Sequence, residues 1–260
     1  MDNLRLSAPI LDYDGEPEAI LEPRKLLAPL EHMPAYGVIC FFQDVITHFV
    51  DLGLATEIYA LRSEMGRHPI YVHEVQGHRV ALFHPGVGAP LAAGILEEVI
   101  ALGCRNFVAC GGAGVLNREL AAGHLVVPTA AVRDEGTSYH YLPPSRMVEP
   151  SPAAVVAIEH TLRQRKVEYI LGKTWTTDAI YRETRARMAL RRSEGCVTVE
   201  MEAAALFAVA QFRQVHLGQI LYCGDNLDGD EWDGREWQKN WGVREILLEL
   251  AAESCLAMNL

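Results

Sequence analysis

The feature that most constrains the fold of this chain is a repeated alternation of short apolar runs with stretches of helical periodicity. Six runs have the composition and length of strands: Gly37 to Phe42, Arg79 to His84, Asn106 to Cys110, Leu125 to Val132, Tyr169 to Trp175 and Gly218 to Cys223. Helical patterns lie near 44–52, 90–102, 152–165, 183–194, 200–212 and 239–258. Such alternation is typical of strands joined by crossover helices. We therefore expect an α/β chain with a mixed, largely parallel central sheet.

The length and the distribution of prolines predict one large domain preceded by an arm. A chain of 260 residues, half of them apolar, can bury a substantial single core. Residues 1–35 differ from the rest because five prolines and many acidic residues oppose regular structure there. We expect residues 1–35 to form an arm that lies over the domain or a neighbouring subunit, and residues 36–260 to form the single large domain.

Charge and cysteine usage exclude several classes of function. Asp and Glu outnumber Lys and Arg by 34 to 23, so the surface should repel nucleic acids and anionic membranes. The six cysteines form no C-x-x-C pair and several lie within apolar runs, which indicates reduced, structural thiols. The first residues lack a basic start followed by an apolar stretch, and no uncharged apolar run is long enough to span a bilayer. A cytoplasmic protein is therefore expected.

Two glycine clusters stand where a parallel sheet would bind a ligand. Gly86 and Gly88 follow one apolar strand and precede a helix that Pro90 can begin, which allows a ligand to approach the backbone and the helix N-terminus. An ordinary tight turn would have the same composition. The second cluster ends the strand Asn106 to Cys110 and comprises Gly111, Gly112, Ala113 and Gly114. Because ligands bind beyond the carboxyl ends of strands, the two loops together predict the floor of one pocket.

Two acidic residues are placed as candidates for chemistry. The stretch 203–210 is apolar on all sides, which implies a buried helix, and helical spacing would place Glu202 on the same face as Leu206 and Val209. Alternatively, Glu202 complements the helix dipole. Asp225 comes directly after the strand Gly218 to Cys223, although a loop acid that caps the next turn would occupy the same position.

No metal site is expected from the acidic residues. The run 225–231, which includes Asp230, resembles a calcium loop in composition, but its glycine does not follow the alternating acids as an EF-hand requires. The histidines form no H-E-x-x-H pattern.

The chain resembles the nucleoside phosphorylase family in four sequence blocks, which occur in the same order as in that family. The family includes purine nucleoside phosphorylases, uridine phosphorylases and related hydrolytic nucleosidases. The blocks are Gly86-Val87-Gly88-Ala89-Pro90, Gly111 to Leu116, Arg133 to Tyr141, and Val199-Glu200-Met201-Glu202-Ala203-Ala204-Ala205. The resemblance implies a three-layer α/β/α sandwich and a homo-oligomer, either a dimer, a trimer or a hexamer, in which neighbouring chains contribute to each site.

The resemblance also implies roles for individual residues. It makes Glu202 the residue that holds the ribose hydroxyls, with Met201 packed against the sugar and Glu200 beside it. Gly86, Gly88 and the cluster 111–114 would line the base and phosphate pocket, and Asp225 would support protonation of the departing base. Breaking an N-riboside builds positive charge on the sugar and negative charge on the base, so carboxyl groups suit both ends of the bond. We expect a pentosyltransferase that acts on a small nucleoside, without a cofactor and with inorganic phosphate as co-substrate.

The chain departs from this family at the expected phosphate site. The family's Gly-Asp-Pro-x-x-Arg loop is replaced by Phe42-Gln43-Asp44-Val45-Ile46-Thr47, and Ala109 and Gly112 replace an arginine and a small hydroxyl residue. Arg133 is a possible substitute ligand. Asp44 is the nearby acid that would activate water in a nucleosidase, and Tyr181 begins the stretch where family members read the base. A hydrolytic nucleosidase and a non-catalytic nucleoside-binding protein stay open as alternatives, as does the choice between purine and pyrimidine.

Overall fold

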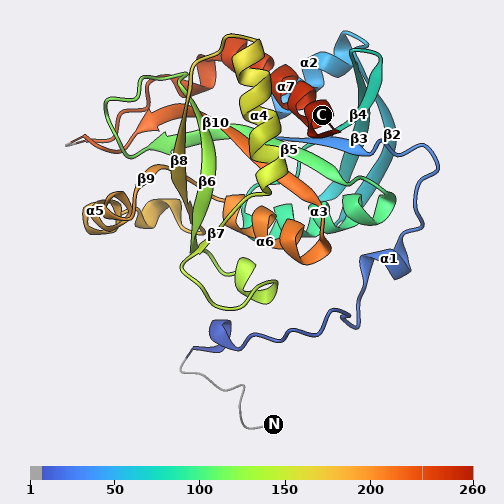
Figure 1. The fold of residues 1–260 in the computed structure, drawn as a ribbon, viewed down its shortest axis with the longest axis horizontal. Helices are drawn as coiled ribbons and strands as arrows, with labels where there is room; N and C mark the ends of the chain where they lie inside the picture. Colours follow the sequence, from blue (N-terminus) through green and yellow to red (C-terminus); the bar gives the residue numbers. More distant parts are fainter. Residues whose placement is uncertain (1–7, 230, 260) are drawn as a thin grey trace.

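The computed structural model describes residues 8–229 and 231–259, and within them the chain forms an α/β fold around a 10-stranded mixed sheet (Figure 1). Residues 1–7 of the predicted arm and Asp230 of the acidic run lie outside the described residues. The strands are β1 (Tyr36–Cys40), β2 (Ala55–Ser63), β3 (Gly66–Val75), β4 (His78–Phe83), β5 (Asn106–Val115), β6 (Leu125–Asp134), β7 (Met147–Val148), β8 (Tyr169–Thr177), β9 (Cys196–Glu200) and β10 (His216–Asn226).

The helices are α1 (Pro23–Leu26), α2 (Gln43–Asp51), α3 (Ala89–Leu102), α4 (Pro152–Gln164), α5 (Arg185–Ser193), α6 (Ala203–Arg213) and α7 (Trp241–Leu256). Short 3-10 turns occur at η1 (Pro9–Leu11), η2 (Ser138–His140), η3 (Ile180–Arg182), η4 (Trp237–Lys239) and η5 (Ala257–Asn259). All six predicted strands and all six predicted helical stretches are present, so local periodicity located most of the elements.

Several boundaries predicted from sequence are wrong. The strand predicted to end at Cys223 continues to Asn226, so Asp225 lies within β10 and does not follow it. The strand predicted to end at Cys110 continues to Val115, so Gly111, Gly112, Ala113 and Gly114 lie within β5 and do not form a loop. These residues stay extended because β10 pairs with them in parallel register up to Ala113, and Gly114 pairs with Val199 of β9. The strands β2, β3, β7 and β9 were not anticipated, and β9 occupies residues just before the helix predicted to start near residue 200.

The sheet closes on itself around its central strands. The strand order is β10-β6-β8-β9-β5-β1-β4-β3-β2, and an additional pairing joins β10 to β5, so that β10, β6, β8, β9 and β5 form a ring. Pairs β1–β4, β1–β5 and β10–β5 are parallel, whereas β5–β9 and β10–β6 are antiparallel. Because β5 and β9 run in opposite directions and pair at their last residues, their carboxyl ends meet.

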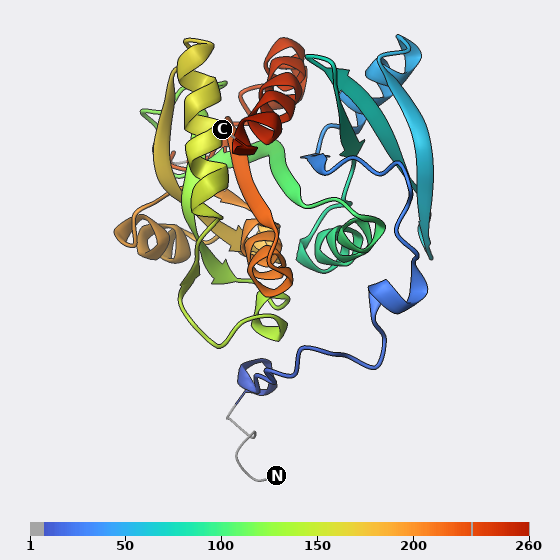
Figure 2. The ribbon, with the colours of Figure 1, turned by 45° about the vertical axis from the view of Figure 1, so that its right-hand side comes forward.

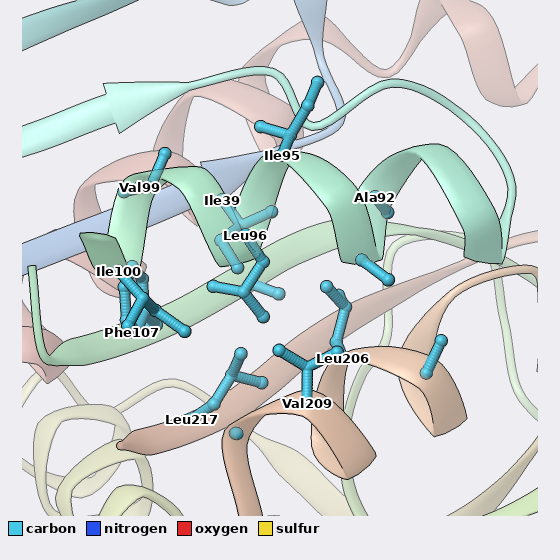
Figure 3. Close-up of a cluster of buried hydrophobic side chains, with 14 of the residues drawn as sticks. Ile39, Ala92, Ile95, Leu96, Val99, Ile100, Phe107, Leu206, Val209 and Leu217 are labelled. Carbon is cyan, nitrogen blue, oxygen red and sulfur yellow. The ribbon is translucent and has the colours of Figure 1, made fainter. Parts of the chain in front are cut away.

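Helices cover both faces of the sheet, which confirms the three-layer arrangement. On one face, α3 and α6 pack against each other and against β1, β5 and β10 through Leu96, Ile100, Phe107, Leu206 and Leu217 (Figure 3). On the other face, α2, α4 and α7 pack on the same strands (Figures 1 and 2). Each fully buried large aliphatic side chain contributes about 1.5–3 kcal/mol, so these two clusters hold the layers together. As predicted, α6 is buried on all sides from Ala203 to Ala210.

The described part of the arm lies against this domain. The arm includes α1 and runs along the side of the domain that carries α3 and α6 (Figures 1 and 2). Glu22 is buried and forms an ion pair with Arg213 of α6 at 3.4 Å, while the backbone N–H of Leu30 donates to the carbonyl of Leu102 at 2.9 Å. The division of the chain at residue 35 stays a prediction. Among the described residues, no helix has the length and apolarity needed to cross a bilayer.

Candidate active site

The Glu200-Met201-Glu202 block lies in the turn between β9 and α6. Glu200 is the last residue of β9, and Glu202 is the N-cap of α6, whose first residue is Ala203. Helical φ and ψ begin only after Glu202, but its carbonyl accepts the N–H of Leu206 at 3.0 Å as in the first turn of a helix, so its alignment with Leu206 and Val209 stays a prediction. The turn aims the two glutamate side chains at different partners.

Glu200 is occupied by bonds within the protein. Its Oε2 accepts the backbone N–H groups of Glu202 at 2.7 Å and Ala203 at 2.6 Å, and its Oε1 accepts the hydroxyl of Thr176 at 2.6 Å. Thr176 lies in β8, and its Oγ1 also accepts the backbone N–H of Ala204 at 3.0 Å. Glu200 thus satisfies helix N–H groups that would otherwise have no partner. These bonds give Glu200 the geometry of a residue that orients the turn.

Glu202 reaches across to the first glycine cluster. Its Oε1 accepts the backbone N–H of Gly88 at 2.6 Å, joining residues 114 positions apart in the chain. Gly88 is the N-cap of α3, and both Gly88 (φ +92°) and Gly86 (φ +82°) have the left-handed backbone conformation that favours glycine. This bond brings the turn at Gly86 and Gly88 together with the Glu202 block.

Burial shapes the titration of both glutamates. Burial raises the pKa of Glu202 well above its ordinary value, the charge of Glu200 raises it further, and the N–H groups of Gly88 and Met201 oppose the change. Burial also raises the pKa of Glu200, and the bonds from Thr176, Ala203 and Glu202 offset part of that effect. Because two buried carboxyl groups close together cannot ionise independently, they release their protons as a pair.

The carboxyl ends of β5 and β10 bring Asp225 to the same region. A Cβ placed on Gly114 would lie 3.5 Å from Oδ1 of Asp225 and 3.0 Å from Cγ1 of Val199 in β9. Asp225 Oδ2 accepts the indole N–H of Trp232 at 2.7 Å. Nearby, burial and the charge of Asp225 raise the pKa of Glu183 to about 7. A side chain at Gly114 would collide with Leu227, whose Cδ1 lies 2.5 Å from that Cβ position, so glycine here permits close packing of the strand ends beside Asp225.

The end of β1 borders an open cavity of about 680 Å³ on the α2 and α7 side of the sheet. It is lined by Phe41, Gln43, Asp44, Thr47, His48, Asp51 and Arg244. Asp44 forms a two-pronged ion pair with Arg244 of α7, at 2.5 Å to Oδ1 and 2.7 Å to Oδ2. The guanidinium of Arg244 also lies over the ring of Phe42, 4.8 Å from its centroid. An arginine therefore stands at the end of β1, but it comes from a helix 200 residues later in the chain.

Two further sequence candidates, Arg133 and Tyr181, differ in burial. Arg133 is buried, and its guanidinium donates to the hydroxyls of Ser138 and Ser145 and to the carbonyls of Leu142 and Pro143. Those bonds hold the segment that follows β6, so Arg133 has the contacts of a structural residue. Tyr181 is 92 % exposed.

Several residues of the site escaped sequence reasoning. Thr176 and Arg244 gave no local signal, because a threonine in a strand and an arginine in a helix are ordinary. Asp178 follows β8, accepts the backbone N–H of Gly136 at 2.8 Å, and raises the pKa of Glu202 through its charge. Among residues 8–229 and 231–259, no three His, Cys, Asp or Glu side chains are grouped as a metal site.

Comparison with known proteins relates this arrangement to a family. A family model described as Phosphorylase superfamily matches residues 35–255. The chain is 31 % identical over 153 residues to a uridine phosphorylase of Treponema pallidum, which covers 55 % of this chain and 59 % of that protein. It is 29 % identical over 151 residues to a guanosine phosphorylase of Halorubrum lacusprofundi, covering 58 % of this chain and 63 % of that protein. The matches thus span about three fifths of the length of these curated relatives.

Solved structures share the fold at lower identity. An AMP nucleosidase from Bacteroides thetaiotaomicron superposes with a TM-score of 0.71 at 24 % identity, covering 86 % of this chain and 88 % of that chain. A purine nucleoside phosphorylase from Toxoplasma gondii, in complex with immucillin-H, superposes with a TM-score of 0.74 at 18 % identity, covering 91 % and 94 %. At these identities the superpositions establish the architecture.

Proposed function

This chain belongs to the Phosphorylase superfamily, and from that premise we propose that it is an enzyme that cleaves the N-ribosidic bond of a nucleoside. The observation that carries the proposal is the bond from the Gly88 N–H to Glu202, because it holds a buried carboxyl group where two of the four sequence blocks meet. A buried carboxylate is costly unless it is satisfied, and a ribose offers hydroxyl groups that would satisfy it.

In the proposed reaction the bond between the sugar carbon and the base nitrogen breaks, and its electron pair leaves with the base. Positive charge then develops on the ribose, and the negative charges of Glu200, of Asp178 and of Glu202 in its ionised form stabilise it. Glu202 binds the sugar hydroxyls, and Met201, which is half-buried beside it, packs against the sugar. Asp225 supports transfer of a proton to the departing base. Glu200 keeps Glu202 in place through its bonds to the start of α6.

We propose phosphate as the acceptor, which would yield a sugar 1-phosphate and the free base. The two relatives described above are both named phosphorylases, and Arg244 brings a guanidinium to the end of β1, where the sequence lacks one. Phosphate would have to displace Asp44 from that guanidinium.

Water is the second candidate acceptor, favoured by the same ion pair. Because Asp44 neutralises Arg244, the cavity at the end of β1 carries no excess positive charge from this pair to attract a phosphate dianion. Both carboxylate oxygens of Asp44 accept from Arg244, so Asp44 would activate water only after that pair opens.

The test is base release from a panel of uridine, guanosine, inosine, adenosine and AMP, followed by chromatography, with and without phosphate. Release that requires phosphate supports phosphorolysis, and release without phosphate assigns hydrolysis. The same panel decides between purine and pyrimidine. Tight nucleoside binding by calorimetry with no release under either condition would mean a binding protein and would overturn the proposed activity.

We further propose a homo-oligomer in the cytoplasm. All six cysteines are free and buried, which is compatible with a reducing compartment. Light scattering coupled to gel filtration would distinguish a monomer from the expected dimer, trimer or hexamer.

A further inference from the structure

His84 lies at the entrance to the glycine turn that holds Glu202. It follows the last residue of β4, is partly buried, and packs edge-on against Phe41, with 6.0 Å between ring centroids and 72° between ring planes. Phe41 follows β1, which is the parallel neighbour of β4. The imidazole therefore stands between the carboxyl ends of two strands that border the candidate site.

The imidazole holds the turn through one ring nitrogen. The backbone N–H of Gly86 donates to Nδ1 of His84 at 3.0 Å. A ring nitrogen accepts only when it carries no proton, so this bond requires the neutral tautomer with its proton on Nε2. Burial lowers the pKa of His84, an effect that a backbone bond to Phe41 opposes and the charge of His68 reinforces. Near neutral pH the burial thus favours the form that can accept.

Two consecutive anchors fix the turn. Nδ1 of His84 accepts from Gly86, and two residues later Glu202 accepts from Gly88 at 2.6 Å. Both glycines have positive φ, and a Cβ on Gly86 would come within 2.1 Å of Leu91 Cδ2. The turn is therefore packed closely against Leu91 at Gly86 but is open at Gly88, and its two hydrogen bonds hold its shape.

We infer that His84 is a positioning residue for the proposed reaction: its Nδ1 holds the turn 84–88 in the shape that presents the Gly88 N–H to Glu202. The inference rests on the proposed role of Glu202 in binding the sugar. His84 can hold the turn only while its Nδ1 accepts a hydrogen bond. Protonation of the ring at Nδ1 removes this acceptor. The other titratable groups that act on this region are His68 of β3, Glu98 of α3, which interacts with His68, and Glu202 itself.

Matched substitutions separate the loss of the hydrogen-bond acceptor at Nδ1 from the loss of the imidazole ring. In His84→Asn, Oδ1 stands near the position of Nδ1 and cannot be protonated at these pH values, whereas His84→Gln offers its oxygen near the position of Nε2. We expect His84→Asn to keep kcat/KM within about threefold of wild type. In a plot of kcat/KM against pH, this variant should also lose the part of the decrease at low pH that comes from protonation of His84. Gln and Ala should lose about tenfold, the worth of one hydrogen bond of about 1.4 kcal/mol. His216→Gln, at an exposed histidine on the opposite end of β10, is the control for a general histidine effect, and His68→Gln tests the contribution of that neighbour to the pH profile.

A second measurement does not depend on turnover. Hydrogen exchange of the peptide covering residues 84–91, followed by mass spectrometry on the full-length chain, should show faster exchange in His84→Ala and His84→Gln, and wild-type exchange in His84→Asn. Equal exchange in all four proteins, or equal kinetics for Asn and Ala, would overturn the inference. If wild type cleaves no nucleoside, the proposed function fails by itself, and the exchange pattern still decides whether His84 holds the turn.

Discussion

Replacing Glu202 by glutamine should change stability and activity in opposite directions. Glutamine keeps an oxygen that can accept the Gly88 N–H, but it removes a carboxylate that is only 6 % exposed. Burying a charge costs several kcal/mol after relaxation, and each N–H bond to it returns about 1.5–3 kcal/mol. With the N–H groups of Gly88 and Met201 as partners and Glu200 as a repelling neighbour, the net cost of the ionised form is about 2 kcal/mol.

The pH dependence has a definite sign. A carboxyl group whose pKa is raised in the folded protein binds its proton more tightly there than in the unfolded chain, so stability falls as pH rises from the ordinary value of 4.5 through the folded pKa. At pH 8, Glu202→Gln should therefore unfold at a Tm about 4–8 °C above wild type for a chain of this size. The difference should vanish near pH 4.5, where wild type is protonated too. Glu168→Gln, at an exposed glutamate, is the control and should not move the Tm.

At pH 8.5, where Glu202 of the wild type is largely ionised, the same variant should lose kcat/KM for nucleoside cleavage by about 100-fold or more, because glutamine lacks the charge that stabilises the ribosyl cation. Differential scanning fluorimetry from pH 4.5 to 8.5 and a base-release assay on the same samples measure both effects. A lower Tm than wild type at pH 8, or a Tm difference that does not change with pH, would refute the reasoning from burial.

Three further substitutions test other parts of the structure. Thr176→Val should lower the free energy of unfolding by about 2–4 kcal/mol in urea, because it removes the 2.6 Å hydroxyl bond to Oε1 of the buried Glu200 and the acceptor of the Ala204 N–H, while the two backbone bonds to Oε2 of Glu200 stay; an unchanged midpoint would contradict this. For His73, burial lowers the pKa, but bonds to Glu249 and to the Leu54 carbonyl raise it to a net increase, so this pair stabilises the fold below the ordinary histidine pKa and loses its effect as pH rises through the folded pKa. Glu249→Gln should accordingly cost about 1 kcal/mol at pH 5.5 and little at pH 8.5, and a cost independent of pH would disprove the assignment. Asp225→Ala should lower kcat for natural nucleosides by about 10²–10³-fold but much less for p-nitrophenyl riboside, whose leaving group needs no proton; equal losses would remove Asp225 from that role.

Much of the architecture was accessible from sequence because helices and strands are local. The periodicity of apolar residues located all six predicted strands and all six predicted helices, and the apolar run after Glu202 correctly predicted a fully buried α6. The glycine and glutamate motifs were also readable, because positive φ at Gly86 and Gly88 and a buried acid at a helix start leave few choices of residue type.

What failed concerned pairing between distant segments. The cluster Gly111 to Gly114 has the composition of a loop but is a strand, because β10 and β9 supply its hydrogen bonds. Val197 and Val199 have strand character, yet β9 is too short to separate from the helix that follows it. The partner of Asp44 could not be read from the sequence either, because Arg244 lies 200 residues away in the chain.

The residue types at the candidate site were thus legible in the linear chain, while their partners were not. Glu202, Gly88 and Asp225 were identified from motif and position, but whether Glu202 contacts Gly88, and whether Thr176 holds Glu200, depends on how β8, β9 and α3 pack. The physical reason is range. Backbone preference and amphipathic period act within a few residues, whereas a hydrogen bond or an ion pair is set by strand register and helix packing, which bring together residues 24 to 200 positions apart.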